Sequence, residues 1–361
     1  MRIIAAFSWI GTYAPRGWKV SRPALTLLGF SLSLLVVLAT AASAQTAEDT
    51  EEEDKIPPPV EYDGKGGNEP KLVTRDGMHL AATYFPGTEG KETVPVILLH
   101  MYKGDRTEYG QLAAYLQSQG HAVLVPDLRG HGESTTGANL RMPLSATNLA
   151  RDDFANMVRF DMEALKEFLR AKNNEGLLNI QKLCVVGAEM GASVALHWTR
   201  LDWERPPVGS YKIGQDVAAM VLISPEWSTP GLPLQTAFRQ GGPPIAIADP
   251  ELAQIYKVPY RMEMRREVSA LIVAGKDDSS AVREARRLFT LLKRYHPDPP
   301  ENERREKQDL FFATLDTSLQ GTKMLGVRSL NLERMIAQFI QLRLVDRAFP
   351  WKTRKLDPHA E

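Results

Sequence analysis

Glu189 stands between two glycines, Gly187 and Gly191, directly after an apolar run. A side chain held on a sharp turn from a strand into a helix needs glycine two positions away on either side, so that strand and helix can approach each other. This spacing places a carboxylate where it can attack a carbon atom or accept a proton. Asp278 and Gln320, which lie a few residues beyond two later apolar runs, carry a carboxylate and an amide.

The composition excludes several classes of function. The 361 residues include 44 basic and 44 acidic side chains, so the formal net charge is zero. This balance gives no reason to expect nucleic acid or an anionic membrane surface as the main partner. The single cysteine, Cys184, excludes an intramolecular disulfide and leaves no cysteine cluster for zinc or an iron–sulfur centre. We expect no metal and no cofactor.

Short apolar runs alternate with segments of helical periodicity. Runs such as 96–99 and 220–223 are apolar without alternation, as expected of strands that helices cover on both faces. The periodicity predicts a helix over 148–172 and another after Asn331. This alternation predicts an α/β fold with a doubly wound, mostly parallel sheet of eight strands. The candidate strands are 71–74, 80–84, 96–100, 122–126, 183–187, 218–224, 270–274 and 310–314.

The chain divides into four segments by composition. In residues 1–44, basic side chains precede an apolar run that ends in small residues, which predicts a signal peptide or an uncleaved N-terminal anchor. Either one exports the folded part to the periplasm or the cell exterior. Residues 45–70 hold an acidic run and three consecutive prolines, which predicts a disordered tether. The folded domain is expected at 71–348 and a C-terminal tail at 349–361.

Four motifs, in this order along the chain, resemble the α/β-hydrolase superfamily. Residues 96–100 resemble the strand that ends in its oxyanion-forming turn. Residues 126–134, Pro-Asp-Leu-Arg-Gly-His-Gly-Glu-Ser, are similar to the loop after the next strand and are the most specific match. Residues 183–192 occupy the place of the nucleophile elbow, and 271–278 resemble the strand and turn that carry the catalytic acid. The resemblance implies an esterase-, lipase- or peptidase-like domain.

The same resemblance implies a serine, a histidine and an acid at three positions, two of which are substituted. Glu189 stands at the nucleophile position, and the chain contains no Gly-x-Ser-x-Gly segment. Gln320 stands where the histidine is expected, and residues 316–325 contain no histidine. Asp278, or its neighbour Asp277, stands at the acid position. Losing the hydroxyl and the imidazole of such a triad lowers the rate by several powers of ten.

The oxyanion region also departs from the family pattern. The resemblance implies the backbone amides of Tyr102 and Met190 as oxyanion donors, but Met101 stands where the family has glycine. Glu189 is predicted at the N-terminus of a helix, whose positive end attracts a carboxylate. We therefore expect the Glu189 carboxylate to fill this site itself.

Three residues of the same turn are candidate binding residues. Lys103 and Arg106 are candidate partners for the Glu189 carboxylate. His100 is a further candidate, although its place in the turn also favours a structural role. A segment at 225–267, rich in proline and glycine, lies where family members carry a lid, and it is expected to form a short lid.

Two functions follow as hypotheses. The first is an exported, catalytically degenerate α/β-hydrolase-fold protein that binds a small molecule or an envelope protein. The second is an active hydrolase, either esterase- or peptidase-like through unrecognised groups or one that uses Glu189 as a carboxylate nucleophile. Neither hypothesis involves nucleic acid, and the membrane enters only through the possible anchor.

Overall fold

A single eight-stranded sheet holds seven of the eight apolar runs that the sequence marks as strands. The computed structural model describes residues 56–63, 72–138, 140, 142–205, 212–238 and 264–354. The chain divides into two units, 1–55 and 56–361, and every described residue belongs to the second. The segment predicted as a signal or anchor, 1–44, lies outside this description. Within the described ranges, no helix combines the length and apolar character needed to cross a membrane.

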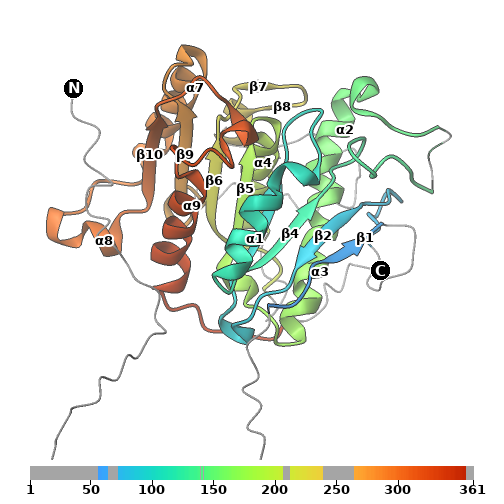
Figure 1. Cartoon of the computed structure of the whole chain (residues 1–361), viewed down its shortest axis with the longest axis horizontal. Helices are drawn as coiled ribbons and strands as arrows, with labels where there is room; N and C mark the ends of the chain where they lie inside the picture. Colours follow the sequence, from blue (N-terminus) through green and yellow to red (C-terminus); the bar gives the residue numbers. More distant parts are fainter. Residues whose placement is uncertain are drawn as a thin grey trace, which may run out of the picture. The chain divides into compact units, whose positions relative to one another are not determined.

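The strands follow the order β1-β2-β4-β3-β5-β6-β9-β10 across the sheet (Figure 1). β2 is antiparallel to β1 and β4, and all other neighbours are parallel, which confirms the predicted fold class. The strands are β1 (Val60–Tyr62), β2 (Ala82–Phe85), β3 (Pro95–Leu99), β4 (Ala122–Pro126), β5 (Leu183–Ala188), β6 (Val217–Ile223), β9 (Ser269–Gly275) and β10 (Leu310–Leu315).

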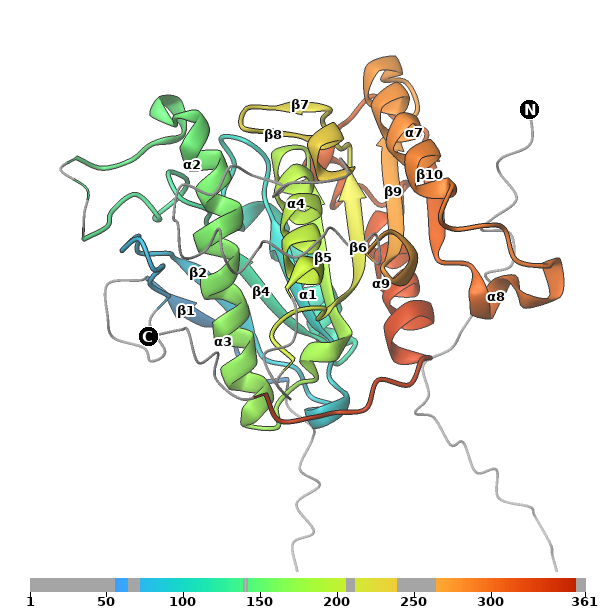
Figure 2. The ribbon, with the colours of Figure 1, turned by 180° about the vertical axis from the view of Figure 1, so that it is seen from behind.

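Helices cover both faces of this sheet. α1 and α9 lie in front of it in Figure 1, whereas α3, α4 and α7 lie in front in the reverse view of Figure 2. The helices are α1 (Gly110–Ser118), α2 (Arg151–Asn156), α3 (Met162–Asn174), α4 (Met190–Glu204), α6 (Met264–Glu267), α7 (Ser279–Lys293), α8 (Arg304–Lys307) and α9 (Leu332–Ile340). Short 3-10 turns at η3 (Arg106–Tyr109), η7 (Leu234–Phe238) and η9 (Gly321–Met324) join these elements.

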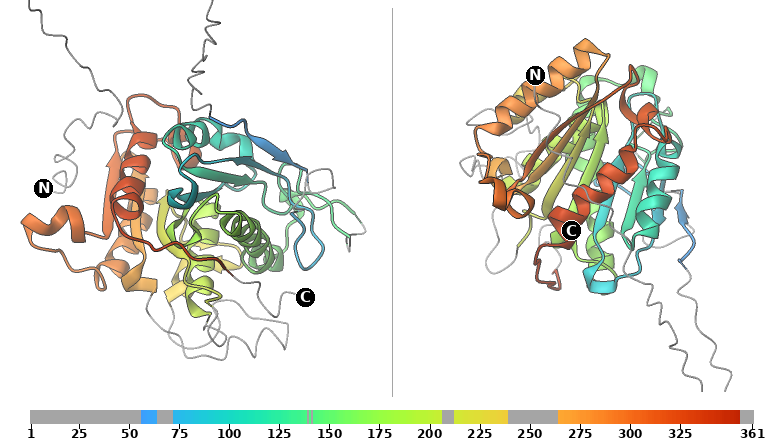
Figure 3. Two further views of the ribbon diagram at one scale, coloured as in Figure 1. Left: turned by 90° about the horizontal axis from the view of Figure 1, so that it is seen from below. Right: turned by 60° about the vertical axis from the view of Figure 1, so that its left-hand side comes forward.

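Two neighbouring residues of β10 contact helices on opposite faces of the sheet. The ring of Phe311 packs edge-on against Phe339 of α9, and the ring of Phe312 packs against Phe289 of α7. Successive side chains of a strand point to opposite faces, so α9 and α7 lie on opposite sides of the sheet, as Figure 3 also shows. The central strands β3, β5 and β9 are consequently buried along their whole length, which explains their apolar sequences.

The helix predicted at 148–172 forms with one irregularity. α2 continues through a π-helical turn, Met157–Asp161, into α3. At this turn the buried Asp161 carboxylate accepts hydrogen bonds from the backbone amide and the Nε of Arg129, at 3.0 and 2.9 Å. The Arg129 guanidinium also donates to Asp76. This buried ion pair fixes the loop at 126–134, the segment with the most specific family signature.

Two predictions about the N-terminal part of the domain are wrong. Val60–Tyr62, within the segment predicted as a tether, forms β1, because Tyr62 is buried against the ring of Phe168 in α3. The run at 71–74 forms no strand among the described residues, and contributes only an isolated bridge between Val73 and His79. The strand at 60–62 was not predicted because it lies among proline and acidic residues. Residues 71–74 were predicted as a strand from their apolar residues alone.

The lid and tail segments are described in part. Residues 225–238 form the hairpin of β7 (Ser228–Thr229) and β8 (Leu232–Pro233), followed by η7. Residues 239–263, the middle of the segment predicted as a lid, lie outside the described residues. In the tail, Asn179 donates a hydrogen bond to the carbonyl of Phe349 at 2.8 Å, and Arg354 pairs with the buried Asp216. Residues 349–354 are therefore packed onto the domain.

Candidate active site

Glu189 occupies a strained turn between β5 and α4. Its backbone angles are φ 49° and ψ −109°, in a region that non-glycine residues rarely adopt. A Cβ added to Gly187 would overlap the backbone of Gly191, and one added to Gly191 would overlap the carbonyl of Leu99 and lie 2.7 Å from that of His100. The two glycines thus allow α4 to approach β5 and β3. The geometry of a nucleophile elbow is present, with a carboxylate in place of the hydroxyl.

The carboxylate of Glu189 lies in an acidic environment. Burial and the Glu226 carboxylate raise the pKa of Glu189, Lys323 opposes this rise, and Glu108 adds to it. Burial also raises the pKa of Glu226 and of Glu108. These neighbours come from η3, from the residues after β6 and from η9, and all of these elements lie at the carboxyl ends of the parallel strands. Burial and the neighbouring carboxylates thus favour the protonated form of the Glu189 carboxyl group.

The loop after β10 lies against Glu189, where the sequence places it. Gly321 has φ 54°, and a Cβ added to it would lie 3.0 Å from Glu189 Oε1 and overlap the sulfur of Met101. Its backbone amide donates to Ser224 Oγ at 3.0 Å. Gln320, the residue before it, begins η9 and is half-buried. The structure thus places the backbone of the loop that contains Gln320 and Gly321 beside the Glu189 carboxylate.

Asp278 caps helix α7, whereas the resemblance implies that it is the catalytic acid. Its Oδ1 accepts hydrogen bonds from the backbone amides of Ser280 and Ala281, at 2.9 and 2.8 Å. These bonds make Asp278 the N-cap of α7, a role worth about 1 kcal/mol in a typical helix. The backbone amide of its neighbour Asp277 donates to the carbonyl of Thr317 at 3.1 Å, so the turn borders the loop after β10.

The Glu189 carboxylate does not occupy the oxyanion region as predicted, and other groups lie beside this region. The Glu189 carboxylate makes no hydrogen bond to the first turn of α4, which begins at the buried Met190. Instead, Glu108 Oε2 accepts from the amide of Met101 at 3.3 Å and from Thr322 Oγ1 at 3.0 Å. The Met101 sulfur accepts from the amide of Thr322 at 3.4 Å. Because methionine replaces glycine here, a thioether and a second carboxylate occupy the space opposite the elbow.

Lys103 and Arg106, which were predicted to pair with Glu189, contact other residues. Arg106 pairs with the buried Asp127 and with Glu133 at 2.7 Å, because η3 turns its side chain toward the end of β4. The ammonium of Lys103 lies 5.5 Å from the centre of the Tyr102 ring. Neither cation forms an ion pair with Glu189 among the described residues, so this prediction is wrong.

Tyr102 and His100 have structural roles. The exposed Tyr102 side chain donates from its hydroxyl to the carbonyl of Ala146 at 2.7 Å. His100 is fully buried, and its Nε2 accepts from the amide of Leu128 at 3.0 Å, so its Nδ1–H donates to the carbonyl of Met101 at 2.7 Å. Burial and the neighbouring His131 lower the pKa of His100 to about 3. A neutral imidazole with both nitrogens occupied cannot bind a ligand, which corrects the prediction for His100.

Sequence reasoning missed four residues around the elbow: Glu108, Ser224, Glu226 and Lys323. Ser224 and Glu226 follow the apolar run 218–223, and polar residues just after a parallel strand are a usable signal for a site. Glu108 and Lys323 lie in 3-10 turns, whose side-chain directions do not follow from an apolar pattern.

The hydroxyls of Ser193 and Ser224 near the elbow have partners other than histidine among the described residues. Ser193 Oγ lies 2.7 Å from Thr229 Oγ1 and 3.4 Å from the carbonyl of Glu226. Ser224 is buried and accepts the bond from Gly321. Within the described part of the chain, neither serine hydrogen-bonds to a histidine. The described side chains of the site can accept hydrogen bonds and hold a proton.

The close approach at the elbow predicts a severe effect of Gly191→Ala. The new methyl group overlaps backbone atoms of β3, which cannot move aside as a side chain can. We expect the free energy of unfolding to fall by about 3 kcal/mol or more, measured by urea denaturation. The matched control is Gly110→Ala at the start of α1, where a Cβ meets nothing within 4 Å and the change should be neutral or stabilising. Equal effects of the two variants would contradict the assigned packing.

The raised pKa of Glu189 predicts a pH-dependent effect of Glu189→Gln. The pKa of Glu189 is higher in the folded chain than in the unfolded chain. The free energy of unfolding of the wild type therefore falls as the pH rises from the unfolded-state pKa to the folded-state pKa. The stability of the variant relative to the wild type should therefore increase as the pH rises through this interval, measured by urea denaturation at several pH values. The control is Glu301→Gln on the exposed η8 (Glu301–Glu303). A stability difference between Glu189→Gln and the wild type that does not change with pH, or that changes no more than the difference measured for Glu301→Gln, would contradict the acidic environment.

Comparison with known proteins supports the assignment of the fold. Residues 96–348 match the alpha/beta hydrolase family. An uncharacterized protein of Mycobacterium tuberculosis, found in two strains, is 30% identical over 159 residues, which are 44% of this chain and 46% of that protein. The chain thus spans about half the length of the curated relatives it matches.

Solved structures of esterases are also similar to this chain. An esterase of Pyrococcus furiosus is 17% identical, with a TM-score of 0.47, over 80% of this chain and 92% of that chain. An esterase of Pyrobaculum calidifontis is 14% identical, with a TM-score of 0.48, over 80% and 86%. The family match covers well over half of the sequence. This chain belongs to the alpha/beta hydrolase family.

Proposed function

We propose that this chain is an exported, catalytically degenerate member of its family that acts by binding a small molecule or an envelope protein. The observation that carries the proposal is the elbow, which has the backbone geometry of a nucleophile site but presents Glu189. The neighbouring loop offers Gln320, which cannot remove a proton at neutral pH. With hydroxyl and imidazole both absent, only binding remains of the family's usual chemistry.

The surroundings of the elbow also oppose acyl transfer. A tetrahedral intermediate carries a developing oxyanion, which needs hydrogen-bond donors in an otherwise neutral or positive site. Here Glu108 already accepts the amide of Met101, and Glu226 adds a further negative charge. An oxyanion at this place would be repelled by these carboxylates.

A carboxylate nucleophile is the rival reading, because the elbow does direct Glu189 into the site. Two features oppose it. A raised pKa favours the protonated carboxyl, which is a poor nucleophile. A covalent ester on Glu189 would also need an imidazole to activate water, and His100 is locked between backbone groups.

Export rests on the sequence of the first 44 residues, in which basic residues precede an apolar run and small residues follow it. The acidic run after it is suited to a solvated connection between this segment and the domain. An envelope partner, or a small molecule of the periplasm or cell exterior, follows from that location.

The experiment compares the wild type with variants that restore the missing groups. A fluorophosphonate probe and a panel of p-nitrophenyl esters should give no labelling and no turnover above background for the wild type. Glu189→Ser combined with Gln320→His should gain weak labelling, because the elbow and the loop are already side by side. The matched control, Glu226→Ser with Gln320→His, places the hydroxyl outside the elbow and should stay silent.

Three outcomes would contradict the proposal. Labelling or ester turnover by the wild type would show an active serine-type hydrolase. Turnover of epoxides or haloalkanes that Glu189→Gln abolishes would establish the carboxylate nucleophile. Equal labelling of the two double variants, or none for a folded Glu189→Ser, Gln320→His chain, would refute the geometric mapping of the site.

A further inference from the structure

The outer edge of β10 pairs with no other strand among the described residues. β10 ends the sheet, and β9 pairs with it in parallel along its whole length (Figure 1). The carbonyls of Asp309 and Leu315 accept hydrogen bonds from the amides of Ala270 and Lys276, at 2.7 Å each. Backbone groups of successive residues point to alternate sides of a strand, so the even-numbered residues of 310–314 direct theirs away from β9.

Most of these outward groups are available to a further strand. The carbonyl of Leu310 accepts from Gln308 Nε2 at 3.2 Å. Within the described ranges, the amide of Leu310 and both backbone groups of Phe312 and Thr314 have no protein partner. Phe312 is half-buried and Thr314 is exposed. Such a row of unpaired amides and carbonyls is a template for the main chain of another polypeptide.

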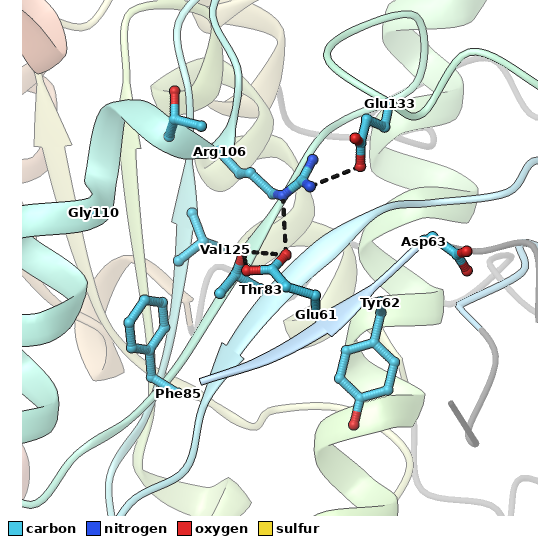
Figure 4. A pocket seen from close by; sticks show the side chains of 10 residues that line it. Glu61, Tyr62, Asp63, Thr83, Phe85, Arg106, Gly110, Val125 and Glu133 are labelled. Atoms are coloured by element: carbon cyan, nitrogen blue, oxygen red, sulfur yellow. Dashed lines mark hydrogen bonds and ion pairs between the residues drawn. The ribbon is translucent and has the colours of Figure 1, made fainter. Parts of the chain in front are cut away.

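The opposite edge of the sheet is protected, whereas the edge at β10 is not. Edge strands are usually short, or carry charges or proline, which discourages a further strand. β1 has three residues, and its Glu61 accepts from Thr83 Oγ1 at 2.8 and 2.9 Å and pairs with Arg106 at 3.5 Å (Figure 4). β10 has six residues, Leu-Phe-Phe-Ala-Thr-Leu, without charge or proline. A free edge of this kind pairs readily with another chain.

The helix α7 supplies positive charge beside this edge. Its buried side packs on β9 and β10, and its exposed side carries four arginines, Arg283, Arg286, Arg287 and Arg294. In the described part of the chain, none of the four pairs with a carboxylate. The one acidic residue of the helix, Glu284, accepts the amide of Trp227 at 3.0 Å on the side toward β6. Like charges three and four residues apart repel, so this arrangement costs the helix stability when no anion is bound.

Arg286 is the arginine that faces the edge strand. Its Cζ lies 5.9 Å from the centre of the Phe312 ring on β10, whereas the Cζ of Arg287 lies 3.7 Å from the centre of the Trp227 ring. A strand added to β10 would place every second side chain on the face that Phe312 occupies, next to Arg286. A guanidinium has five N–H donors in a geometry that matches a carboxylate.

We propose that the free edge of β10 binds an extended acidic segment of another protein, which adds a strand to the sheet and places carboxylates beside Arg286. Main-chain hydrogen bonds to residues 310–314 supply affinity, and the guanidinium supplies selectivity for acidic side chains. A second copy of this chain fits less well, because pairing at the same edge would bring a second Arg286 beside the first. The edge is separate from the elbow, so the proposal does not depend on whether the elbow is catalytic.

NMR titration of the full chain with two matched peptides tests the proposal. The acidic probe is acetyl-Thr-Glu-Val-Glu-Val-Glu-Thr-amide, and the control has lysine in place of each glutamate. We expect a dissociation constant of about 1 mM or below for the acidic peptide and at least tenfold weaker binding of the control. The amide signals of Phe312 and Thr314 should shift and exchange more slowly with water. Those of Phe311 and Ala313, which face β9, should change less.

Two matched pairs of variants separate the main-chain and charge contributions. Thr314→Pro removes an outward N–H at an exposed edge position, so it should weaken binding of the acidic peptide about tenfold or more, whereas Thr314→Ala keeps the N–H and should change it less than twofold. Arg286→Gln should weaken binding about fivefold, since single exposed ion pairs are weak. Arg287→Gln, on the β6 side of the same helix, should change it less than twofold. The Arg286 pair and the amide signals decide the outcome even where Thr314→Pro lowers the melting temperature.

The proposal fails on any of four results. The first is no binding of the acidic peptide up to 10 mM. The second is equal binding of the acidic and basic peptides, or equal effects of Arg286→Gln and Arg287→Gln. The third is binding that leaves the amide signals of Phe312 and Thr314 unchanged. The fourth is self-association of the wild type in sedimentation that Thr314→Pro abolishes and Thr314→Ala retains, which would assign this edge to a second copy.

Discussion

The close approach of α4 to β3 and β5 is the constraint on which the site depends. It requires glycine at 187 and 191, and it forces the residue between them to a positive φ with its side chain at the carboxyl ends of the parallel strands. A protein that keeps this turn also keeps a side chain that projects from it at the carboxyl ends of the parallel strands. In this chain the aimed group is a carboxylate, and the elements around it bring Glu108 and Glu226 toward it. The chain has thus kept the backbone geometry of the elbow and presents a carboxylate from it.

The other polar residues of the motifs that resemble the family make structural contacts. Asp127 holds Arg106, Arg129 holds Asp161, and His100 bridges two backbone groups. These buried contacts join the loop at 126–134 to η3 and to the turn between α2 and α3. A buried pair is costly to break, because the remaining charge is left without a partner. Such residues can persist in a chain whether or not it catalyses a reaction, so their presence says more about the fold than about activity.

Sequence patterns predicted the fold better than the contacts of the site. Seven of the eight apolar runs form strands, and the elbow glycines lie where their spacing indicated, because burial and close packing dictate both. The directions of Lys103 and Arg106 were wrong, since the 3-10 turn η3 sends Arg106 to Asp127 and leaves Glu108 facing the elbow. β1 was not predicted, because it has only three residues and one of them, Tyr62, packs against Phe168, a contact that the sequence does not indicate. Such tertiary contacts leave no periodic signal.

The absence of covalent chemistry at the elbow is the central claim, and intact-mass spectrometry tests it directly. The protein is mixed with an excess of activated esters, quenched within milliseconds to seconds, and digested to map any added mass. The account predicts no stoichiometric acyl group on the peptides that carry Glu189, Ser193 or Ser224. One acyl group per chain on any of these three residues would contradict it.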